Sequence, residues 1–255
     1  MMCKKHGFTL IELLVVISII AVLMAIMMPA LRKAKSQASQ VVCQSNLRQL
    51  VMSLAGYTGD SNGQMPQGWN DTVAAGSRWL DVLRPYYGES STVTLCPIAK
   101  KETDITDTAN IIFRAFTTQS DLYNYKGVFK SSYGFNEWVY KVTSGSRKNK
   151  SWQSMFTVNS AKDVPVFLDC AAASGWPEPY NEPPQFVGDS GFNTVEQMKR
   201  FCIPRHGDYV NGTFIDLSVR KVGLKQLWKL KWHRTYNTNS PQPRWPEWMD
   251  GIKDY

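Results

Sequence analysis

The residues with the clearest capacity for chemistry lie near the C-terminal end of the chain, around a histidine. His206, Asp208 and Asp216 flank a run of β-forming residues, and they could meet across a hairpin and hold a metal ion. Calcium takes about six to eight oxygen ligands, but only Asp208, Asp216 and a neighbour such as Asn211 offer oxygens here. We therefore predict no cofactor, with calcium at Asp208 and Asp216 as the weaker alternative. We expect His206 instead to hydrogen-bond Asp216 or the backbone and to fix the hairpin.

A second pattern, Gly188-Asp189-Ser190-Gly191, is similar to the nucleophile site of chymotrypsin-like proteases. Phe192 stands where a further glycine would be expected, and a triad also needs a histidine base with a carboxylate partner. Neither His206 nor His233 lies in a recognisable triad context. The pattern therefore predicts a polar turn, and we expect no catalytic residue and no enzymatic activity.

The elements that position these residues begin with an N-terminal apolar run. The segment from Phe8 to Met28 has a single charged residue, Glu12. A helix of about 20 apolar residues spans the roughly 30 Å hydrocarbon core of a bilayer. This run is longer than the h-region of a cleaved secretory signal, and it ends in Met27-Met28-Pro29 rather than at a small-residue cleavage site. The segment therefore predicts one membrane-spanning helix.

Glu12 is the anomaly in this helix. A carboxylate costs about 2.5–3.5 kcal/mol at mid-bilayer, so it needs a partner or a position near the headgroups. If the chain were cut after Gly7, Glu12 would lie in the first turns of a new helix, where the macrodipole favours an anion. The new amino group of Phe8 would then be a cation in need of a partner.

Gly7-Phe8-Thr9-Leu10-Ile11-Glu12 resembles the processing site of type IV prepilins and type II secretion pseudopilins. The resemblance implies that a prepilin peptidase cuts after Gly7 and methylates the nitrogen of Phe8. It also implies that Glu12 pairs with the N-terminal amine of a neighbouring subunit during assembly, and that Pro29 kinks the helix.

The same resemblance implies where the chain resides and what it meets. We expect a single-pass protein of the inner membrane with its head in the periplasm or outside the cell, and a filament after assembly. Its partners would be further copies of itself, other pilins or pseudopilins, the prepilin peptidase, an inner-membrane assembly platform and membrane lipid. The basic residues do not set this orientation, because Lys4 and Lys5 flank one side of the span while Arg32, Lys33 and Lys35 flank the other.

A second resemblance extends into the rest of the chain. The stretch from Cys43 to Leu50, the pair Cys96-Pro97 and the stretch from Ser132 to Asn136 are similar to a large prepilin-like family that is abundant in planctomycetes. That family ends in a histidine followed after nine residues by Asp-Gly; here His206 is followed by Asp216, with Leu217 in place of the glycine. Membership implies a pilin-like fold and export, and we expect the turn after Asp216 to differ.

Four cysteines remain after Cys3 has left with the leader: Cys43, Cys96, Cys170 and Cys202. An even number on an exported domain predicts two disulfides, for which three connectivities are possible. We favour Cys43–Cys96 and Cys170–Cys202, since each pair is near in sequence. The chain has no Cys-x-x-Cys pair, which disfavours a zinc site.

The apolar periodicity predicts one long helix from Phe8 to about Ala55, ended by Gly56 and the run from Gly59 to Gly63. Its first half is apolar all round and its second half has an apolar stripe for docking onto a sheet. The fold class is therefore α+β and type IV pilin-like, with a long N-terminal helix packed on an antiparallel sheet. We divide the chain into a leader (1–7), a transmembrane or filament-core helix (8–29), an amphipathic continuation (30–55) and a globular head with a Pro- and Trp-rich tail (56–255).

Within the head, residue types predict short elements. Asn211-Gly212 inside a β-forming run is the strongest short hairpin signal, so we place a turn there. The other predictions are a helix at Ser77–Leu83, strands at Ser132–Val139, Asp163–Asp169 and Ser218–Val222, an irregular segment at Trp176–Gln185 and a short helix around Leu224–Trp228.

Charge and aromatic content leave one alternative open. The chain carries a formal charge of +8, but its basic residues are scattered and the cluster at Arg147–Lys150 is interpreted as a solvated loop, so no specific nucleic-acid partner is expected. Nine tryptophans all follow residue 56. We interpret them as core and tail-docking residues. The alternative is a membrane-tethered binding module that uses a Trp-rich surface for a polysaccharide or a partner protein.

Overall fold

The structure is a computed structural model that describes residues 9–67, 79–88, 92–99, 112–120, 127–191 and 195–253. The chain divides into two compact units, Met1–Val41 and Val42–Tyr255. Each unit is described by itself below. The predicted leader lies outside the described residues.

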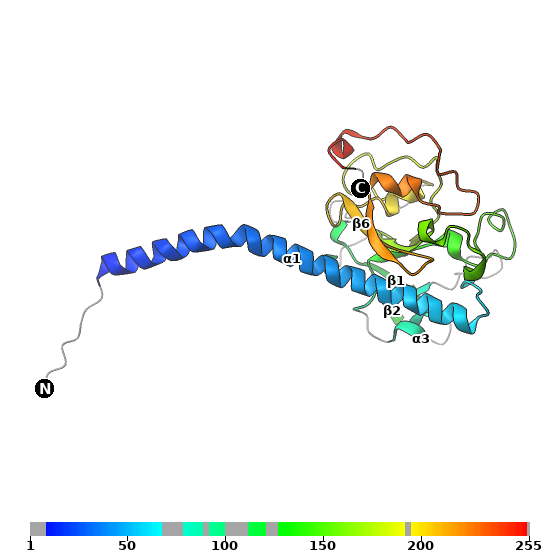
Figure 1. The fold of residues 1–255 in the computed structure, drawn as a ribbon, viewed down its shortest axis with the longest axis horizontal. Coiled ribbons are helices and arrows are strands. Elements are labelled where there is room, and N and C mark those ends of the chain that lie inside the picture. The colour runs from blue at the N-terminus through cyan, green and yellow to red at the C-terminus, as the bar shows by residue number, and fades with distance from the viewer. Residues whose placement is uncertain are drawn as a thin grey trace. The chain divides into compact units, whose positions relative to one another are not determined.

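One helix, α1 (Leu10–Asp60), dominates the N-terminal part of the chain and is the ribbon drawn from blue to cyan in Figure 1. Every described residue from Thr9 to Ala38 is exposed, and the large apolar side chains from Leu10 to Leu31 have no cover. Among the described residues, α1 is the one helix long and apolar enough to cross a membrane. The predicted long apolar N-terminal helix is confirmed.

The helix ends five residues later than predicted. Gly56 and Gly59 lie inside α1, and Tyr86 fills the space beside Gly56, where an added Cβ would lie 3.0 Å from the Tyr86 ring. The stop comes at Asn62 and Gly63, which adopt positive φ values of 52° and 76°. Gly63 N donates to Thr58 O at 2.7 Å, which is the six-to-one bond of a Schellman cap.

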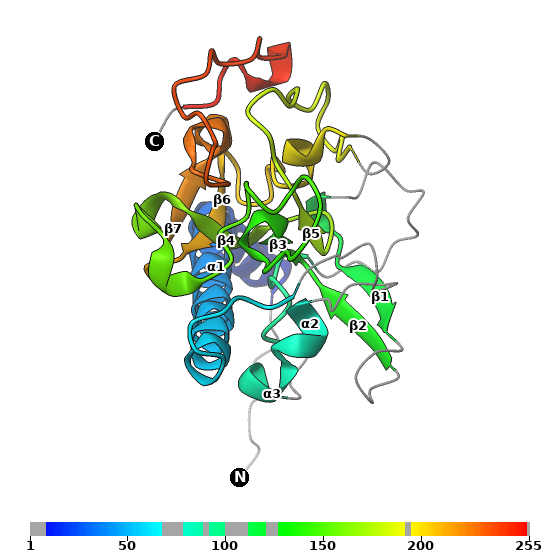
Figure 2. The same ribbon diagram turned by 90° about the vertical axis from the view of Figure 1, so that its right-hand side faces the viewer.

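The second unit is built on a five-stranded sheet with the strand order β5-β3-β4-β6-β7 (Figure 2). The strands are β3 (Tyr133–Asn136), β4 (Pro165–Asp169), β5 (Ser174–Gly175), β6 (Tyr209–Phe214) and β7 (Val219–Gly223). All neighbouring pairs are antiparallel except β3 and β5, so the sheet is mixed. The predicted α+β class is confirmed, with the parallel edge pair as the one departure.

The remaining elements are short. A separate antiparallel pair is formed by β1 (Phe116–Ser120) and β2 (Gly127–Ser131). The helices are α2 (Trp79–Val82), α3 (Arg84–Tyr87), η2 (Glu137–Val139), η3 (Met155–Thr157), η4 (Ala161–Asp163), η5 (Gln197–Arg200), η6 (Lys225–Lys229) and η7 (Glu247–Met249). The predicted strand at Ser132–Val139 is therefore shorter, because Asn136 Oδ1 accepts from Trp138 N and starts a 3₁₀ turn.

The last turns of α1 dock on this unit through a stripe of buried side chains. Cys43, Leu47, Leu50 and Leu54 recur at spacings of three and four, as an amphipathic helix requires, and all are fully buried. They join β3 and β4 residues such as Phe135 and Phe167 in one apolar cluster. A second cluster, which includes Leu168, Phe201 and Trp232, gathers η5, η6 and the C-terminal part.

The predicted turn at Asn211-Gly212 is wrong. Both residues lie inside β6, where they pair with Lys221 and Arg220 of β7. The turn comes later, at Asp216 and Leu217, and Leu217 takes a φ of 66°. Gly212 serves close packing instead, since a Cβ at this position would lie 3.2 Å from the side chain of Leu168.

The described tryptophans are structural. Trp79, Trp138, Trp152, Trp228 and Trp232 are buried, while Trp176, Trp245 and Trp248 are half-buried. Several indole N–H groups donate to backbone carbonyls of irregular segments, as Trp138 does to Pro177 (2.9 Å) and Trp248 to Pro184 (2.8 Å). The proline-rich segment 176–185 follows β5 and has no helix or strand. These bonds hold it against the core.

Gly134 in β3 gives a testable packing prediction. A Cβ there would lie 2.5 Å from Cys170 Sγ and 2.8 Å from Ala172 O. We expect Gly134→Ala to lower the free energy of unfolding by about 1–3 kcal/mol through overpacking. Denaturant unfolding followed by tryptophan fluorescence measures it. Gly59→Ala is the matched control, because no atom lies within 4 Å of its added Cβ; it should be neutral or slightly stabilising, and equal effects of the two would refute the prediction.

Candidate functional site

The start of α1 carries the first group of candidate residues. Thr9 N and Thr9 Oγ1 both donate to Glu12 Oε2 at 2.8 Å, and Glu12 N donates to Thr9 Oγ1 at 3.3 Å. This reciprocal pattern is a capping box, in which a threonine N-cap and a glutamate three residues later satisfy each other's backbone N–H groups. Glu12 is thus held at the positive end of the helix dipole, which favours its charge. Gly7 and Phe8 lie outside the described residues.

The surface behind Glu12 is suited to an apolar environment. From Leu10 to Met28 the polar side chains are Glu12 and Ser18. Ser18 Oγ donates to Val15 O at 2.8 Å, so its hydroxyl is satisfied within the helix. Such a surface must be covered by lipid or by other apolar chains, because large exposed apolar patches are rare on soluble monomers. α1 continues through Pro29, and the kink at Pro29 stays a prediction.

The four cysteines of the second unit differ from the disulfide prediction. Cys43, Cys96, Cys170 and Cys202 are all buried free thiols in the structure. Cys170 Sγ accepts a hydrogen bond from Ala172 N at 3.4 Å, and burial raises the pKa of Cys170 to about 12. Cys202 lies in the second apolar cluster, where burial also raises its pKa. Cys43 and Cys96 belong to the first apolar cluster, but their sulfurs also contact polar side chains.

Cys43, Cys96, Asp169 and His206 form a group that we call the buried cluster. His206 Nε2 lies 3.5 Å from Cys96 Sγ and 3.3 Å from Asp169 Oδ2. Cys43 Sγ lies 3.7 Å from Asp169 Oδ1 and 3.8 Å from Oδ2. One ligand-type atom from each of the four residues lies within 4.8 Å of the others. All four residues are buried.

Different elements supply the buried cluster. Cys43 comes from α1, Cys96 from the loop at 92–99, Asp169 from the end of β4 and His206 from the loop before β6. Because these residues are far apart in the sequence, no local motif predicts the buried cluster. Asp169, which is fully buried at the centre, is the member that sequence reasoning missed altogether.

Arg205 lies beside the buried cluster and is itself buried. Its Nη1 donates to Asp169 Oδ1 at 3.1 Å and to Ser132 O at 2.6 Å. Its other guanidinium nitrogens donate to three further backbone carbonyls, those of Ile112, Arg114 and Cys170. A buried charge is tolerated only when it is paired and hydrogen-bonded in this way.

Further donors point at the buried cluster. Asn211 N donates to Asp169 Oδ2 at 2.9 Å, and Asn211 Nδ2 donates to Cys43 Sγ at 3.3 Å. The hydroxyl of Tyr133 also donates to Cys43 Sγ, at 3.3 Å. The residue expected to form a hairpin turn therefore serves instead to orient a carboxylate and a thiol.

The pKa values in the buried cluster are strongly perturbed. Burial opposes the charge of His206, but its contacts with Asp169 and Cys96 prevail and raise its pKa to about 9. A hydrogen bond from Cys43, with help from His206, lowers the pKa of Cys96 to about 6, whereas burial raises the pKa of Cys43. Burial would raise the pKa of Asp169, but His206 and Arg205 hold it below its usual value.

The structure does not bring together His206 and Asp216, which the sequence predicts to form a hydrogen bond. His206 contacts Asp169, whereas Asp216 lies exposed in the β6–β7 turn and accepts from Ser218 N and Oγ. Asp208 and Asp216 lie at opposite ends of β6, and a strand of that length is roughly 20 Å long. The two carboxylates therefore cannot share one calcium ion.

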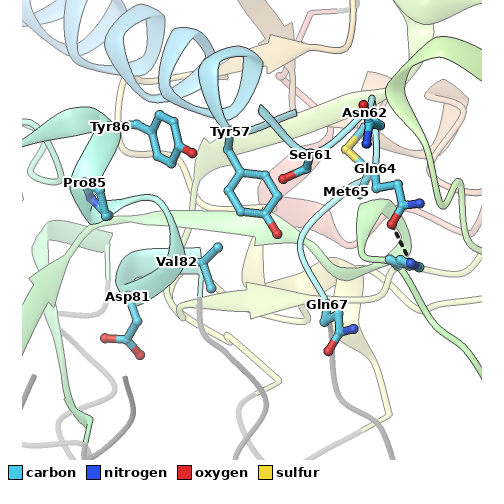
Figure 3. A pocket seen from close by; sticks show the side chains of 11 residues that line it. Tyr57, Ser61, Asn62, Gln64, Met65, Gln67, Asp81, Val82, Pro85 and Tyr86 are labelled. Carbon is cyan, nitrogen blue, oxygen red and sulfur yellow. Dashed lines mark hydrogen bonds between the residues drawn. The ribbon is translucent and has the colours of Figure 1, made fainter. Parts of the chain in front are cut away.

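A pocket of about 690 Å³ lies elsewhere in the second unit (Figure 3). Figure 3 shows Tyr57 and Tyr86 on one side and Gln64 on the other, where Lys141 Nζ donates to Gln64 Oε1 at 2.5 Å. The remaining lining residues are Ser61, Asn62, Met65, Gln67, Asp81, Val82 and Pro85. The walls present mostly amides, hydroxyls and aromatic rings, and the described lining residues include no histidine or cysteine.

The geometry defines a class of protein: an α+β unit with a long exposed apolar helix whose capped N-terminus carries a glutamate. Residues 2–28 match the model of the prokaryotic N-terminal methylation motif. Over 61 residues, 24% of this chain, the chain is 45% identical to the type IV wide pilus major component PilA4 of Thermus thermophilus. The alignment covers 47% of that relative, so the chain spans about half the length of the relative that it matches. No solved structure matches.

The chain is therefore a type IV prepilin-like protein. Motif, relative and fold agree on this, and the resemblance drawn from Gly7 to Glu12 is confirmed at this level. Membership of the larger family with the C-terminal His-x9-Asp-Gly signature stays a prediction.

Proposed function

We propose that the chain is a structural subunit of a type IV pilus-like or type II secretion pseudopilus fibre. The observation that carries the proposal is the N-terminal methylation motif on a helix whose large apolar side chains are exposed in the part of the chain that the structure describes. Such a surface suits a membrane before assembly and the apolar core of a fibre afterwards. In this proposal the subunit is cut after Gly7 by a prepilin peptidase, methylated at Phe8 and anchored once in the inner membrane until an assembly platform extracts it.

The chemistry of Glu12 supports a role in stacking. A cut after Gly7 would place the amine of Phe8 next to Thr9, and the capping box already holds the Glu12 carboxylate at that end of the helix. In the low dielectric of a fibre core, a carboxylate is costly unless it meets a cation. The amine of the next subunit is such a cation. The proposal assigns the chain no catalytic role.

The alternative, a membrane-tethered module that binds polysaccharide or protein through tryptophans, has less support. Among the described residues no tryptophan is exposed, and most of the indole N–H groups are bound to backbone carbonyls. A stacking platform for sugar rings needs exposed aromatic faces.

Processing can be tested directly. We expect membranes with an active prepilin peptidase to yield a chain that begins at N-methylated Phe8, as measured by intact-mass and N-terminal peptide mass spectrometry. Gly7→Leu should leave the full-length chain from Met1, since a bulky side chain replaces the residue before the cut. An uncut native chain in cells where a second prepilin is processed normally would contradict the proposal.

A further inference from the structure

We propose that Cys43, Cys96, Asp169 and His206 bind one divalent transition-metal ion of the zinc type in the second unit. The chain has no Cys-x-x-Cys motif, and the sequence alone disfavoured such a site. The site is independent of the fibre assembly proposed above, because all four ligands belong to the second unit.

The spacing of the ligand atoms carries the proposal. In a tetrahedral zinc site with Zn–S bonds of about 2.3 Å and Zn–N or Zn–O bonds of about 2.0–2.1 Å, neighbouring ligand atoms lie about 3.3–3.8 Å apart. The buried cluster shows 3.3 Å from His206 Nε2 to Asp169 Oδ2 and 3.5 Å from His206 Nε2 to Cys96 Sγ. It shows 3.8 Å from Cys43 Sγ to Asp169 Oδ2. These contacts have the lengths of the edges of one tetrahedron.

The surroundings supply the supporting contacts that a metal site needs. Arg205 Nη1 and Asn211 N donate to the two oxygens of Asp169 and fix the plane of this carboxylate. Asn211 Nδ2 and the Tyr133 hydroxyl both donate to Cys43 Sγ, so two donors would support this sulfur when it binds the ion as a thiolate. Such outer contacts orient ligands and hold a site in shape.

The negative charge of the ligands is also balanced by the positive charge of the ion and of Arg205. Two thiolates and one carboxylate carry three negative charges, and a divalent ion together with the buried Arg205 supplies three positive charges. Binding releases to solvent the protons that the thiols and the imidazole carry before the ion arrives. Thiolate and imidazole ligands select zinc-type ions over calcium and magnesium, which prefer oxygen.

Open space reaches one of the ligands. Cys96 lines a pocket of about 390 Å³ together with Val42, Asn46 and Lys130. This pocket would be the entry path of the ion. Once bound, it would tie α1 to β4, to the loop at 92–99 and to the loop before β6.

The test uses the full chain in detergent, purified under reducing conditions without chelator and then dialysed against zinc. We expect one equivalent of zinc per chain by elemental analysis, and X-ray absorption with two sulfur ligands at about 2.3 Å and two lighter ligands at about 2.0–2.1 Å. Cobalt in place of zinc should give a thiolate charge-transfer band. Removing the ion with a strong chelator should lower the Tm by about 5 °C or more, since an ion that binds only the folded state stabilises it.

Variants separate this site from adventitious binding. Cys96→Ser and His206→Gln should lose the zinc and the cobalt band, whereas Cys202→Ala, which removes a buried thiol outside the buried cluster, should keep both. Two results would overturn the proposal: less than about a tenth of an equivalent of zinc on the native chain, or zinc retained in full by Cys96→Ser. A Cys43–Cys96 disulfide in protein isolated from cells with its thiols blocked at lysis would overturn it as well. The X-ray absorption spectrum and the cobalt band of the native chain test the proposal even if a variant fails to fold.

Discussion

Replacing Glu12 by alanine should abolish incorporation of this chain into fibres while leaving its processing and its head intact. The carboxylate has no cation within the described part of its own chain, and its partners there are the N–H and hydroxyl of Thr9. Removing one partner of a buried ion pair costs about 3–5 kcal/mol, so each subunit contact should weaken by far more than tenfold. The amount of this chain in sheared filaments, measured by immunoblot against the head, gives the size of the effect.

Two further variants separate charge from capping. Glu12→Gln keeps a side chain that is compatible with the capping box but removes the negative charge, so we expect it to fail like alanine. Thr9→Val removes the capping hydroxyl, which is worth about 1 kcal/mol, but keeps the charge, so it should assemble. Mass spectrometry of the N-terminus confirms that every variant is cut. Normal assembly of Glu12→Gln would show that Glu12 acts as a helix cap alone.

Replacing Arg205 by methionine should unfold or strongly destabilise the head. The guanidinium supplies the charge partner of Asp169 and donors to four backbone carbonyls, and its side chain is fully buried. Breaking a buried pair by removing one partner costs about 3–5 kcal/mol. Denaturant unfolding of the full chain in detergent, followed by tryptophan fluorescence, measures the loss, since all nine tryptophans lie beyond the stem.

The matched control for this substitution is Arg48→Met. Arg48 is exposed on α1 and donates to Leu217 O at 2.8 Å. We expect a change within about 0.5 kcal/mol, as is usual for surface positions. Similar unfolding midpoints for the two variants would mean that the bonds of Arg205 contribute little to stability.

The stem could be predicted from the sequence because its signals are local. An apolar run of sufficient length predicts both a helix and an apolar surface along it. The capping box at Thr9 and Glu12 joins residues only three positions apart in the sequence. The helix end was missed because Gly56 and Gly59 usually stop a helix, whereas Tyr86 packs against Gly56 and the turn chemistry lies at Asn62-Gly63. Tertiary contact overrides local preference at such positions.

The head shows the opposite case. Asn211-Gly212 has the strongest local turn signal in the chain. In the structure, however, Gly212 leaves room for the side chain of Leu168, and Asn211 donates hydrogen bonds to Asp169 and Cys43. The buried cluster is assembled from residues far apart in sequence, and only the fold shows that they meet. The sequence suggests other roles for three of its residues, Cys43 and Cys96 as disulfide cysteines and His206 as a hairpin histidine, because composition cannot tell which partner each one meets.

The most direct measurement is mass spectrometry on filaments isolated by shearing from the cells that make this chain. The proposed function predicts that the filaments contain the chain and that its first residue is N-methylated Phe8, with Glu12 present and unmodified. A chain that is absent from filaments, remains in the membrane and still begins at Met1 would contradict it.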